Sequence, residues 1–330
     1  MKVLLTGATG FVGAAVMRRL VKEYSEVRVL IREASNRQNL TGADVEICIG
    51  DLLDIKSLET AVSGCDILIH TAADYRIWAP NPKEMMEANV SGTKNVMTAA
   101  SRAGVNKIIY TSSVAALGLA NDGAEANEDT VSKLEDKIGP YKQSKFLAEE
   151  EVLRMHKEQG LPVTIVNPSA PIGPGDVKPT PTGRFVIQAA SGKIPAYVDS
   201  GLNIVHVDDV AEGHLLAIKK GEEGEKYILG GENLSLLEIL TMIGELSGHR
   251  PPIFKLPHEL ILPIAYVAEF WAKYISGKEP FANVDGAKMA RKPMYYSSKK
   301  AIKELGYKAR PVKGAFIDSI NWFKEYGYIS

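Results

Sequence analysis

Residues 1–13 read MKVLLTGATGFVG, a short apolar run followed by glycines at positions 7, 10 and 13. The continuous apolar run 3–5 predicts a strand that is buried on both faces. Apolar residues then recur at helical spacing, so the stretch predicts a strand, a glycine turn and a helix. In that context Gly7 permits a tight turn, Gly10 lets the backbone approach a pyrophosphate, and Gly13 allows the helix to pack closely on the strand. The free N–H groups at the start of the helix would hold phosphates, which predicts a dinucleotide site.

Length and composition are those of an ordinary soluble globular protein. The 330 residues are 45% hydrophobic and 24% charged, and a formal net charge of −1 gives no reason to expect nucleic-acid binding. Two cysteines, Cys48 and Cys65, are too few for a disulfide framework or a zinc site, and we predict no metal. Because the first strand begins at residue 2, we expect no signal or transit peptide and a cytoplasmic location.

The most apolar later stretch is 256–274, LPHELILPIAYVAEFWAKY. It contains four ionisable residues and is interrupted by Pro263, so we predict that it does not span a membrane. A pair of helices that covers a binding cleft is the simplest interpretation, and a helix lying in a membrane interface is the alternative.

Strand and helix patterns alternate through the first two-thirds of the chain. After the first strand, further strands are predicted at 27–31, 45–49, 67–70, 107–111 and 163–166, with helices notably at 57–61, 85–103 and 141–159. This alternation predicts an α/β fold, a Rossmann-like doubly wound parallel sheet with a smaller C-terminal substrate lobe. We assign 1–168 to a nucleotide-binding domain and expect 203–230 to return to its sheet. Residues 169–202 and 231–330 would form mainly the substrate lobe and C-terminal helices.

Residues at the ends of the predicted strands indicate the cofactor. An enzyme that prefers NAD usually has an acidic residue about 20 residues past the glycines, whereas Arg32 and Arg37 occur near that position here. A guanidinium suits a 2′-phosphate, so we favour NADP(H); Glu33 could still bind a ribose, which leaves NAD(H) open. Candidate cofactor contacts along these strand ends and in the glycine turn are Thr9, Phe11, Val12, Asp51, Thr71, Ala72, Ala73 and Thr111.

A hydroxyl, a phenol and an amine form the predicted catalytic group. The fifth strand ends in Thr111, Ser112 and Ser113, at the edge of the sheet where ligands bind. Tyr141 and Lys145 are four residues apart at the head of a helix and therefore share one face. A nearby ammonium favours the phenolate and brings the pKa of the phenol toward the working range. Ser113 would hydrogen-bond the substrate oxygen while Tyr141 exchanges its proton and Lys145 also holds the nicotinamide ribose.

These motifs resemble those of the extended short-chain dehydrogenase/reductases, the NAD-dependent epimerase/dehydratase family, over nearly the whole chain. Four stretches resemble in particular its hopanoid-associated sugar epimerases and dihydroflavonol-4-reductase-like members: HTAADYRIWAPNPKEMMEANVSGT, IGPYKQSKFLAEEEV, VNPSAPIGPGDVKPTPTGR and GLNIVHVDDVAEGHLLA. The resemblance implies that Leu52 joins Asp51 at the adenine end, that Asn89 lies beside the active site, and that Pro168 and Ser169 flank the nicotinamide. It also implies a homodimer.

The substrate residues are less well defined by the sequence. A loop after the fourth strand offers two aromatic candidates, and the lobe offers three polar ones; together these are Tyr75, Trp78, Arg184, His206 and Arg291. The expected partner is a small molecule, a ketone or aldehyde or else a nucleotide sugar.

Three functions remain open. The first is an NADP(H)-dependent reductase that transfers hydride once between the cofactor and a carbonyl or secondary alcohol. The second is a nucleotide-sugar epimerase or dehydratase that recycles tightly bound NAD. The third is a redox-sensing dinucleotide-binding module without catalysis, and the presence of both Tyr141 and Lys145 argues against it.

Overall fold

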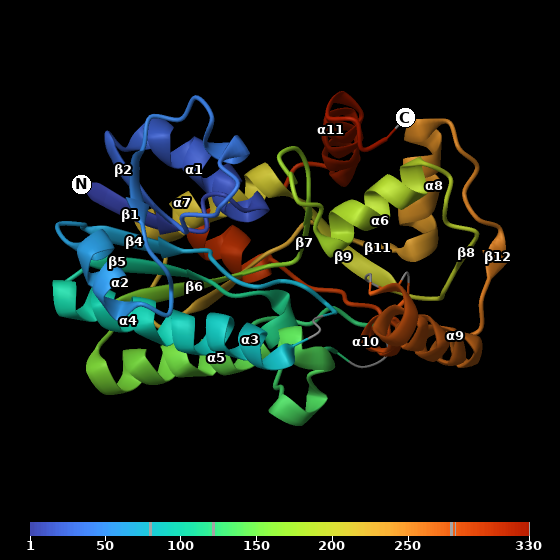
Figure 1. The fold of residues 1–330 in the computed structure, drawn as a ribbon, viewed down its shortest axis with the longest axis horizontal. Helices are drawn as coiled ribbons and strands as arrows, with labels where there is room; N and C mark the ends of the chain where they lie inside the picture. The colour runs from blue at the N-terminus through green and yellow to red at the C-terminus, as the bar shows by residue number, and fades with distance from the viewer. Residues whose placement is uncertain (79–80, 121–122, 278–279, 281, 330) are drawn as a thin grey trace.

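A parallel sheet of seven strands organises the first part of the chain (Figure 1). The structure is a computed structural model that describes all residues except 79–80, 121–122, 278–279, 281 and 330. In spatial order the strands are β10 (Lys226–Leu229), β6 (Val163–Pro168), β5 (Lys107–Thr111), β4 (Ile67–His70), β1 (Lys2–Thr6), β2 (Glu26–Ile31) and β3 (Glu46–Ile49). The strand order reverses between β1 and β4, and sheets of this kind bind ligands at the carboxyl ends of the strands there. The predicted Rossmann-like doubly wound sheet is confirmed.

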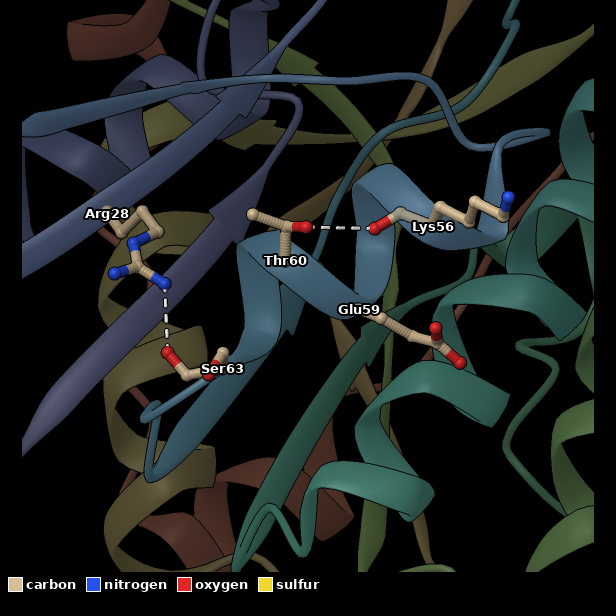
Figure 2. Close-up of a pocket in the computed structure, with 5 residues that line it drawn as sticks. All are labelled: Arg28, Lys56, Glu59, Thr60 and Ser63. Carbon is tan, nitrogen blue, oxygen red and sulfur yellow. Dashed lines mark hydrogen bonds between the residues drawn. The ribbon is translucent and has the colours of Figure 1, made fainter.

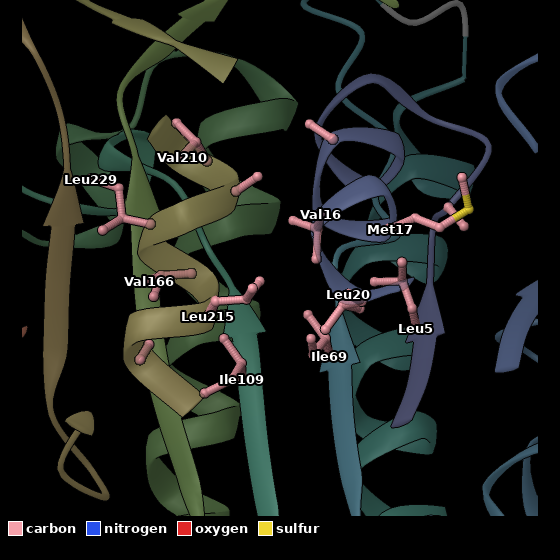
Figure 3. Packing of buried hydrophobic residues seen from close by; sticks show 14 of the residues in the cluster. Leu5, Val16, Met17, Leu20, Ile69, Ile109, Val166, Val210, Leu215 and Leu229 are labelled. Carbon is pink, nitrogen blue, oxygen red and sulfur yellow. The ribbon is translucent and has the colours of Figure 1, made fainter. Parts of the chain in front are cut away.

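Helices cover both faces of this sheet. On one face, α1 (Phe11–Glu23) packs against α7 (Val207–Lys220) over the strands. Leu20 of α1 and Leu215 of α7 meet Ile69 and Ile109 of the strands in one buried cluster (Figure 3). Each side chain of this size contributes about 1.5–3 kcal/mol when it is fully buried. The other face carries α2 (Ile55–Val62), α4 (Gly92–Ala103) and α5 (Gly139–Gln159).

The predicted helix 85–103 is divided into three parts. It consists of α3 (Pro82–Met86), a wider π-helical turn (Glu87–Ser91) and α4. The turn contains Asn89, whose side chain is buried. Such π-helical insertions re-aim side chains and are frequent at functional sites.

A second, smaller lobe is built around three strands, β11 (Glu232–Ser235), β9 (Gly201–His206) and β7 (Ala170–Ile172). Its core includes residues from three helices, α6 (Pro181–Ala190), α8 (Leu236–Ser247) and α11 (Val312–Glu325). The lobe continues with β8 (Ala196–Tyr197), β12 (Phe254–Lys255), α9 (His258–Trp271), a turn (Ala272–Ser276) and α10 (Val284–Met289). Short helical turns elsewhere are Gln38–Leu40, Val114–Ala116, Leu134–Asp136 and Ala301–Leu305. In the part of the chain that the structure describes, no helix is long and apolar enough to cross a bilayer.

The return of the chain to the main sheet is only partly as expected. Of the segment 203–230, β10 joins that sheet beside β6, but β9 belongs to the three-stranded sheet. The reason is that the chain leaves the main sheet directly after β6 to form β7, and β9 pairs in parallel with β7. The following helix begins at Val207, where the His206 side chain accepts the Asp208 N–H as an N-cap.

Candidate active site

The glycine turn fits the phosphates of a dinucleotide. Gly7 has a left-handed φ of +79°, and a Cβ on Gly13 would lie 2.1 Å from the Gly7 carbonyl oxygen, so both positions require glycine. Gly10 caps α1, and the helix has no side chain bonded to its first turn. A Cβ on Gly10 would approach only the Gly7 oxygen, at 3.3 Å, so the space beside it stays open for a ligand. The first-turn N–H groups are therefore free to bind an anion.

The adenine end of the site lies beyond β2 and β3. Arg32 and Arg37 are exposed in the segment after β2, and Arg37 lies 3.8 Å from the Glu33 carboxylate. The Asp51 carboxylate accepts the Leu53 N–H at 2.9 Å, which fixes the turn after β3.

Asn39 links the segment after β2 to the glycine turn. Its Nδ2 donates to the Thr9 carbonyl oxygen at 3.2 Å and to that of Gly175 at 3.1 Å, so it also reaches the second lobe. Asn39 could not be predicted from the sequence, because a single asparagine in a polar segment gives no signal.

Small residues line the end of β4. Thr71 Oγ1 donates to the Thr6 carbonyl oxygen at 2.7 Å, and Ala72 and Ala73 follow without bulk. Asn89 holds the backbone of Asp74, the next residue, in place. Its Oδ1 accepts the Asp74 N–H at 2.7 Å, and its Nδ2 donates to the Asp74 carbonyl oxygen at 2.8 Å. The same Nδ2 donates to the Ser144 hydroxyl at 2.9 Å, so the residue clamps this loop to α5.

The predicted catalytic residues come from β5 and α5. The Lys145 ammonium is buried and donates to the Thr111 carbonyl oxygen at 2.9 Å, which fixes α5 against the carboxyl end of β5. Ser113 follows β5, and its Oγ accepts the Ala115 N–H at 3.1 Å. Burial raises the pKa of the Tyr141 phenol, and interaction with the Ser113 side chain lowers it. The structure therefore brings all three predicted residues to the same edge of the sheet.

Burial lowers the pKa of Lys145 to about 8, and the carboxylate of Glu149 opposes this shift. Glu149 is itself buried one helical turn further along α5. Its Oε2 accepts from Asn167 Nδ2 at 2.7 Å, and the same amide nitrogen lies 3.1 Å from the Ser113 carbonyl oxygen. Through Asn167, Glu149 thus connects α5 to the serine backbone, and its Oε1 lies 3.5 Å from the Lys226 ammonium. Neither Glu149 nor Asn167 was predicted, although Glu149 continues the four-residue spacing of Tyr141 and Lys145.

Several buried polar atoms near the site lack a partner. The hydroxyls of Ser112 and Ser169 and the Oδ1 of Asn167 are buried with no hydrogen bond in the structure. Buried polar groups are nearly always satisfied, so Ser169 fits a contact to the predicted nicotinamide. Pro168 precedes it as the last residue of β6.

The five predicted substrate residues are dispersed. The Tyr75 hydroxyl donates to the Lys178 carbonyl oxygen at 3.3 Å, and burial raises the pKa of this phenol. Arg184 Nη1 donates to the Pro179 carbonyl oxygen at 3.3 Å. Trp78 is half-buried and Arg291 is exposed after α10. His206 is buried; its Nδ1 accepts the Asp208 N–H and its Nε2 lies 3.1 Å from Asp318, so its side chain caps α7. A contact of His206 with the substrate stays a prediction.

Two lysines beside Tyr141 were not predicted. Burial lowers the pKa of Lys142 to about 8, and its Nζ lies 3.5 Å from the Met294 sulfur, a residue of the C-terminal part of the chain. Lys137 donates to the Leu117 carbonyl oxygen at 2.5 Å, and burial lowers its pKa to about 8 as well. Lysines are too common on helices for a sequence pattern to single these out.

A surface hollow lies away from these residues (Figure 2). It has a volume of about 660 Å³ and is lined by Arg28, Lys56, Glu59, Thr60 and Ser63. Arg28 comes from β2 and the other four residues from α2 and its C-terminal end, and Arg28 donates to the Ala61 and Ser63 carbonyl oxygens at 2.6 and 3.0 Å. Arg28 is thus used to cap a helix. Ser63 also lies toward the amino ends of the strands, so we do not assign the active site there.

Comparison with known proteins agrees with this geometry. The model of the NAD dependent epimerase/dehydratase family matches residues 3–230. A Synechocystis sp. protein provisionally named dihydroflavonol 4-reductase is 42% identical over 98% of this chain and 95% of its own length. Sterol demethylase protein B of Methylococcus capsulatus is 35% identical over the full length of both chains. The crystal structure of gox2253 superposes with a TM-score of 0.90 at 51% identity, over 100% of this chain and 99% of that one.

A dinucleotide-type sheet with a serine, a tyrosine and a lysine at its ligand-binding edge defines the class as a nucleotide-dependent α/β enzyme. The chain belongs to the NAD-dependent epimerase/dehydratase family.

Proposed function

We propose that the protein is an NADP(H)-dependent oxidoreductase that interconverts a carbonyl and a secondary alcohol. The observation that carries this proposal is the position of Tyr141 and Lys145 on one face of α5, with Lys145 bonded to the end of β5 and Ser113 beside them. Two of the compared proteins are also named as reductases, the Synechocystis sp. protein at 42% identity and cinnamoyl-CoA reductase 2 of Medicago truncatula at 28% identity.

The cofactor would supply hydride, and the protein would bind and orient it. The first-turn N–H groups of α1 would hold the pyrophosphate, and Ala72, Ala73 and Ser169 would line the central part and the nicotinamide. Exposed Arg32 and Arg37 would bind a 2′-phosphate, which favours NADP(H).

The protein's own residues would move the proton. Ser113 would hydrogen-bond the substrate oxygen and Tyr141 would donate its proton to that oxygen during reduction, or accept it during oxidation. The Lys145 ammonium would favour the phenolate form of Tyr141, opposing the effect of burial on its pKa. Glu149 would help to keep Lys145 charged.

The second candidate is an epimerase or dehydratase that keeps NAD bound through its cycle. It is favoured by Glu33, an exposed carboxylate in the segment that would meet the adenosine ribose, which could bind the ribose hydroxyls in place of a phosphate.

Identifying the bound nucleotide separates the two candidates. The purified protein would be denatured, and the released nucleotide and its redox state determined by chromatography. For a reductase we expect an empty site that binds NADPH more tightly than NADH. Stoichiometric NAD⁺ retained through purification would instead indicate the self-recycling enzyme and contradict the role given to Arg32 and Arg37.

The tyrosine is tested by Tyr141→Phe. We expect turnover to fall by about 10²–10⁴-fold, because general acid–base catalysis typically contributes that factor. Cofactor affinity, measured by fluorescence titration with NADPH, should change little. Unchanged turnover would rule out the proton transfer proposed for Tyr141.

A further inference from the structure

Helix α9 and the turn after it carry large apolar side chains on the outside. The helix lies at the outer edge of the second lobe (Figure 1). Val267 is 70% exposed and Tyr274 is 65% exposed, although most large apolar residues of the protein are buried. We define the α9 face as the exposed residues Leu260, Ile264, Val267, Phe270, Trp271 and Tyr274. Their spacing of three or four residues places them along one side of the helix.

The inner side of α9 carries buried alanines and two partly buried aliphatic side chains. Ala265 belongs to a small core with Val284 and Ala287 of α10, and Ile261 and Leu262 pack against it. The aromatic side chains of the α9 face are therefore additional to this core, whereas an ordinary surface helix turns its large apolar residues inward. A contiguous exposed apolar surface of this kind marks an interaction site.

The surroundings of the α9 face are basic. Among the described residues of 248–292, six cations are exposed, and Glu259 is the one exposed acidic residue. The cations are Arg250, Lys255, Lys273, Lys288, Arg291 and Lys292, of which Lys255 is paired with the exposed Asp199 carboxylate at 2.7 Å. The whole chain has a net charge of −1, so this positive excess is local to α9, α10 and the segments around them.

Glu269, on the opposite side of α9, does not reduce this excess on the outer surface. Its Oε1 accepts the Val284 N–H at 2.8 Å, so the carboxylate is directed at α10. An apolar helix face with aromatic residues, surrounded by cations, is complementary to the interface of an anionic bilayer.

We propose that the α9 face docks onto the headgroup region of an anionic lipid bilayer, with the helix lying parallel to the membrane plane. Trp271 and Tyr274 would lie at headgroup depth, where amphipathic aromatic rings are preferred. The cations around the face would contact lipid phosphates. This does not require a membrane-spanning helix, and it does not depend on which reaction the enzyme catalyses.

Helix α9 is connected to the catalytic helix through α10. A Cβ on Gly139, the first residue of α5, would be 2.7 Å from the Asp285 carboxylate of α10, and α10 also packs against the inner side of α9.

The test is co-sedimentation of the full chain with vesicles. One set is made of phosphatidylcholine alone and the other of phosphatidylcholine mixed with phosphatidylglycerol. We expect binding to the mixed vesicles that weakens with added salt. The double variant Val267→Glu/Trp271→Glu should bind at least about tenfold more weakly, because two inserted apolar side chains are lost.

The matched control is Ile302→Glu. Ile302 is 54% exposed, as is Leu260, but it lies in the turn Ala301–Leu305, which packs against α7. This variant should bind vesicles as the native chain does. All three proteins should keep their circular dichroism spectrum and melting temperature, because the changed side chains are exposed.

Other results would overturn the proposal. Absence of binding to the mixed vesicles does so directly. If the native chain also forms a dimer by light scattering and Val267→Glu/Trp271→Glu makes it a monomer, the α9 face is instead an interface between copies of the chain. Equal loss of binding in Ile302→Glu would show that added negative charge, and not the α9 face, controls the result.

Discussion

Two neighbouring parts of the active site are built in different ways. The glycine turn between β1 and α1 is made of backbone and small residues, and its geometry depends on the absence of side chains at Gly7 and Gly13. The first half of α5 and the turn before it carry long ionisable side chains that are buried, notably Lys137, Lys145 and Glu149. The first part is therefore sensitive to added volume and the second to altered charge.

The largest expected effect is on the glycine turn. Gly13→Ala would place a Cβ 2.1 Å from the Gly7 carbonyl oxygen, so α1 must shift away from β1. We expect a loss of about 3 kcal/mol of unfolding free energy, at the upper end of overpacking effects. Urea denaturation measures it.

Gly10→Ala is the matched control for that variant. Its Cβ would meet only one atom, at 3.3 Å, and the φ of Gly10 is −85°, which alanine adopts freely. Stability should change little, whereas cofactor affinity should fall because the Cβ occupies space beside the phosphates. Equal destabilisation by both variants would contradict the distinction between the two glycines.

The next effect concerns charge in α5. The pKa of Lys145 is lowered by burial to about 8, compared with about 10.4 in an unfolded chain. At a pH between these two values, Lys145 is protonated in the unfolded chain and deprotonated in the folded one. The free energy of unfolding therefore rises with pH from about 8 to about 10 because of this lysine.

Lys145→Met should therefore reduce the slope of unfolding free energy against pH in that window by at most about 1.4 kcal/mol per pH unit. Lys22→Met, on the exposed end of α1, is the control and should leave the slope unchanged. A slope that is the same in Lys145→Met and in the native chain would show that Lys145 titrates normally.

Glu149→Gln also tests the pKa of Lys145, and the expected effect is smaller. It keeps an acceptor for Asn167 but removes the negative charge that raises the pKa of Lys145. We expect that pKa to fall by about one unit, which NMR titration of ¹³C-labelled lysine in the cofactor-free protein would detect. Glu150→Gln, the exposed neighbour on α5, should leave it unchanged. A shift of equal size in both variants would contradict a specific role for Glu149.

The smallest effect lies outside both regions. His206→Ala removes the N-cap of α7 and should cost about 1 kcal/mol in unfolding free energy. His206→Asn restores a capping side chain and should recover part of it. If both variants stay folded at the assay temperature and turnover still falls at least tenfold, His206 contacts the substrate.

The predictability of these parts from sequence differs for physical reasons. The glycine turn and the spacing of Tyr141 and Lys145 are local, so short motifs predict where they lie. Asn39 and Asn167 act through contacts between segments that are far apart in the chain, up to 136 residues for Asn39 and Gly175. The capping role of His206 was not predicted, because a histidine beside two aspartates is compatible with either a ligand contact or a helix cap.

The division between main sheet and lobe was also predicted only in part. Alternating strands and helices fix a parallel sheet, but they do not tell which of two sheets a later strand joins. For β9 that choice depends on β7, which has only three residues and a proline at its centre.

The chain passes repeatedly between its two lobes. It leaves the main sheet after β6, returns with α7 and β10, leaves again with β11, and comes back once more where Ala301, Leu305 and Tyr307 join the core beneath α7. Neither lobe is therefore a continuous piece of the gene, and neither can be exchanged by recombining one segment. Changes in substrate specificity would then arise by point substitutions and loop changes where the two lobes meet. We also expect the two lobes to unfold in a single cooperative transition.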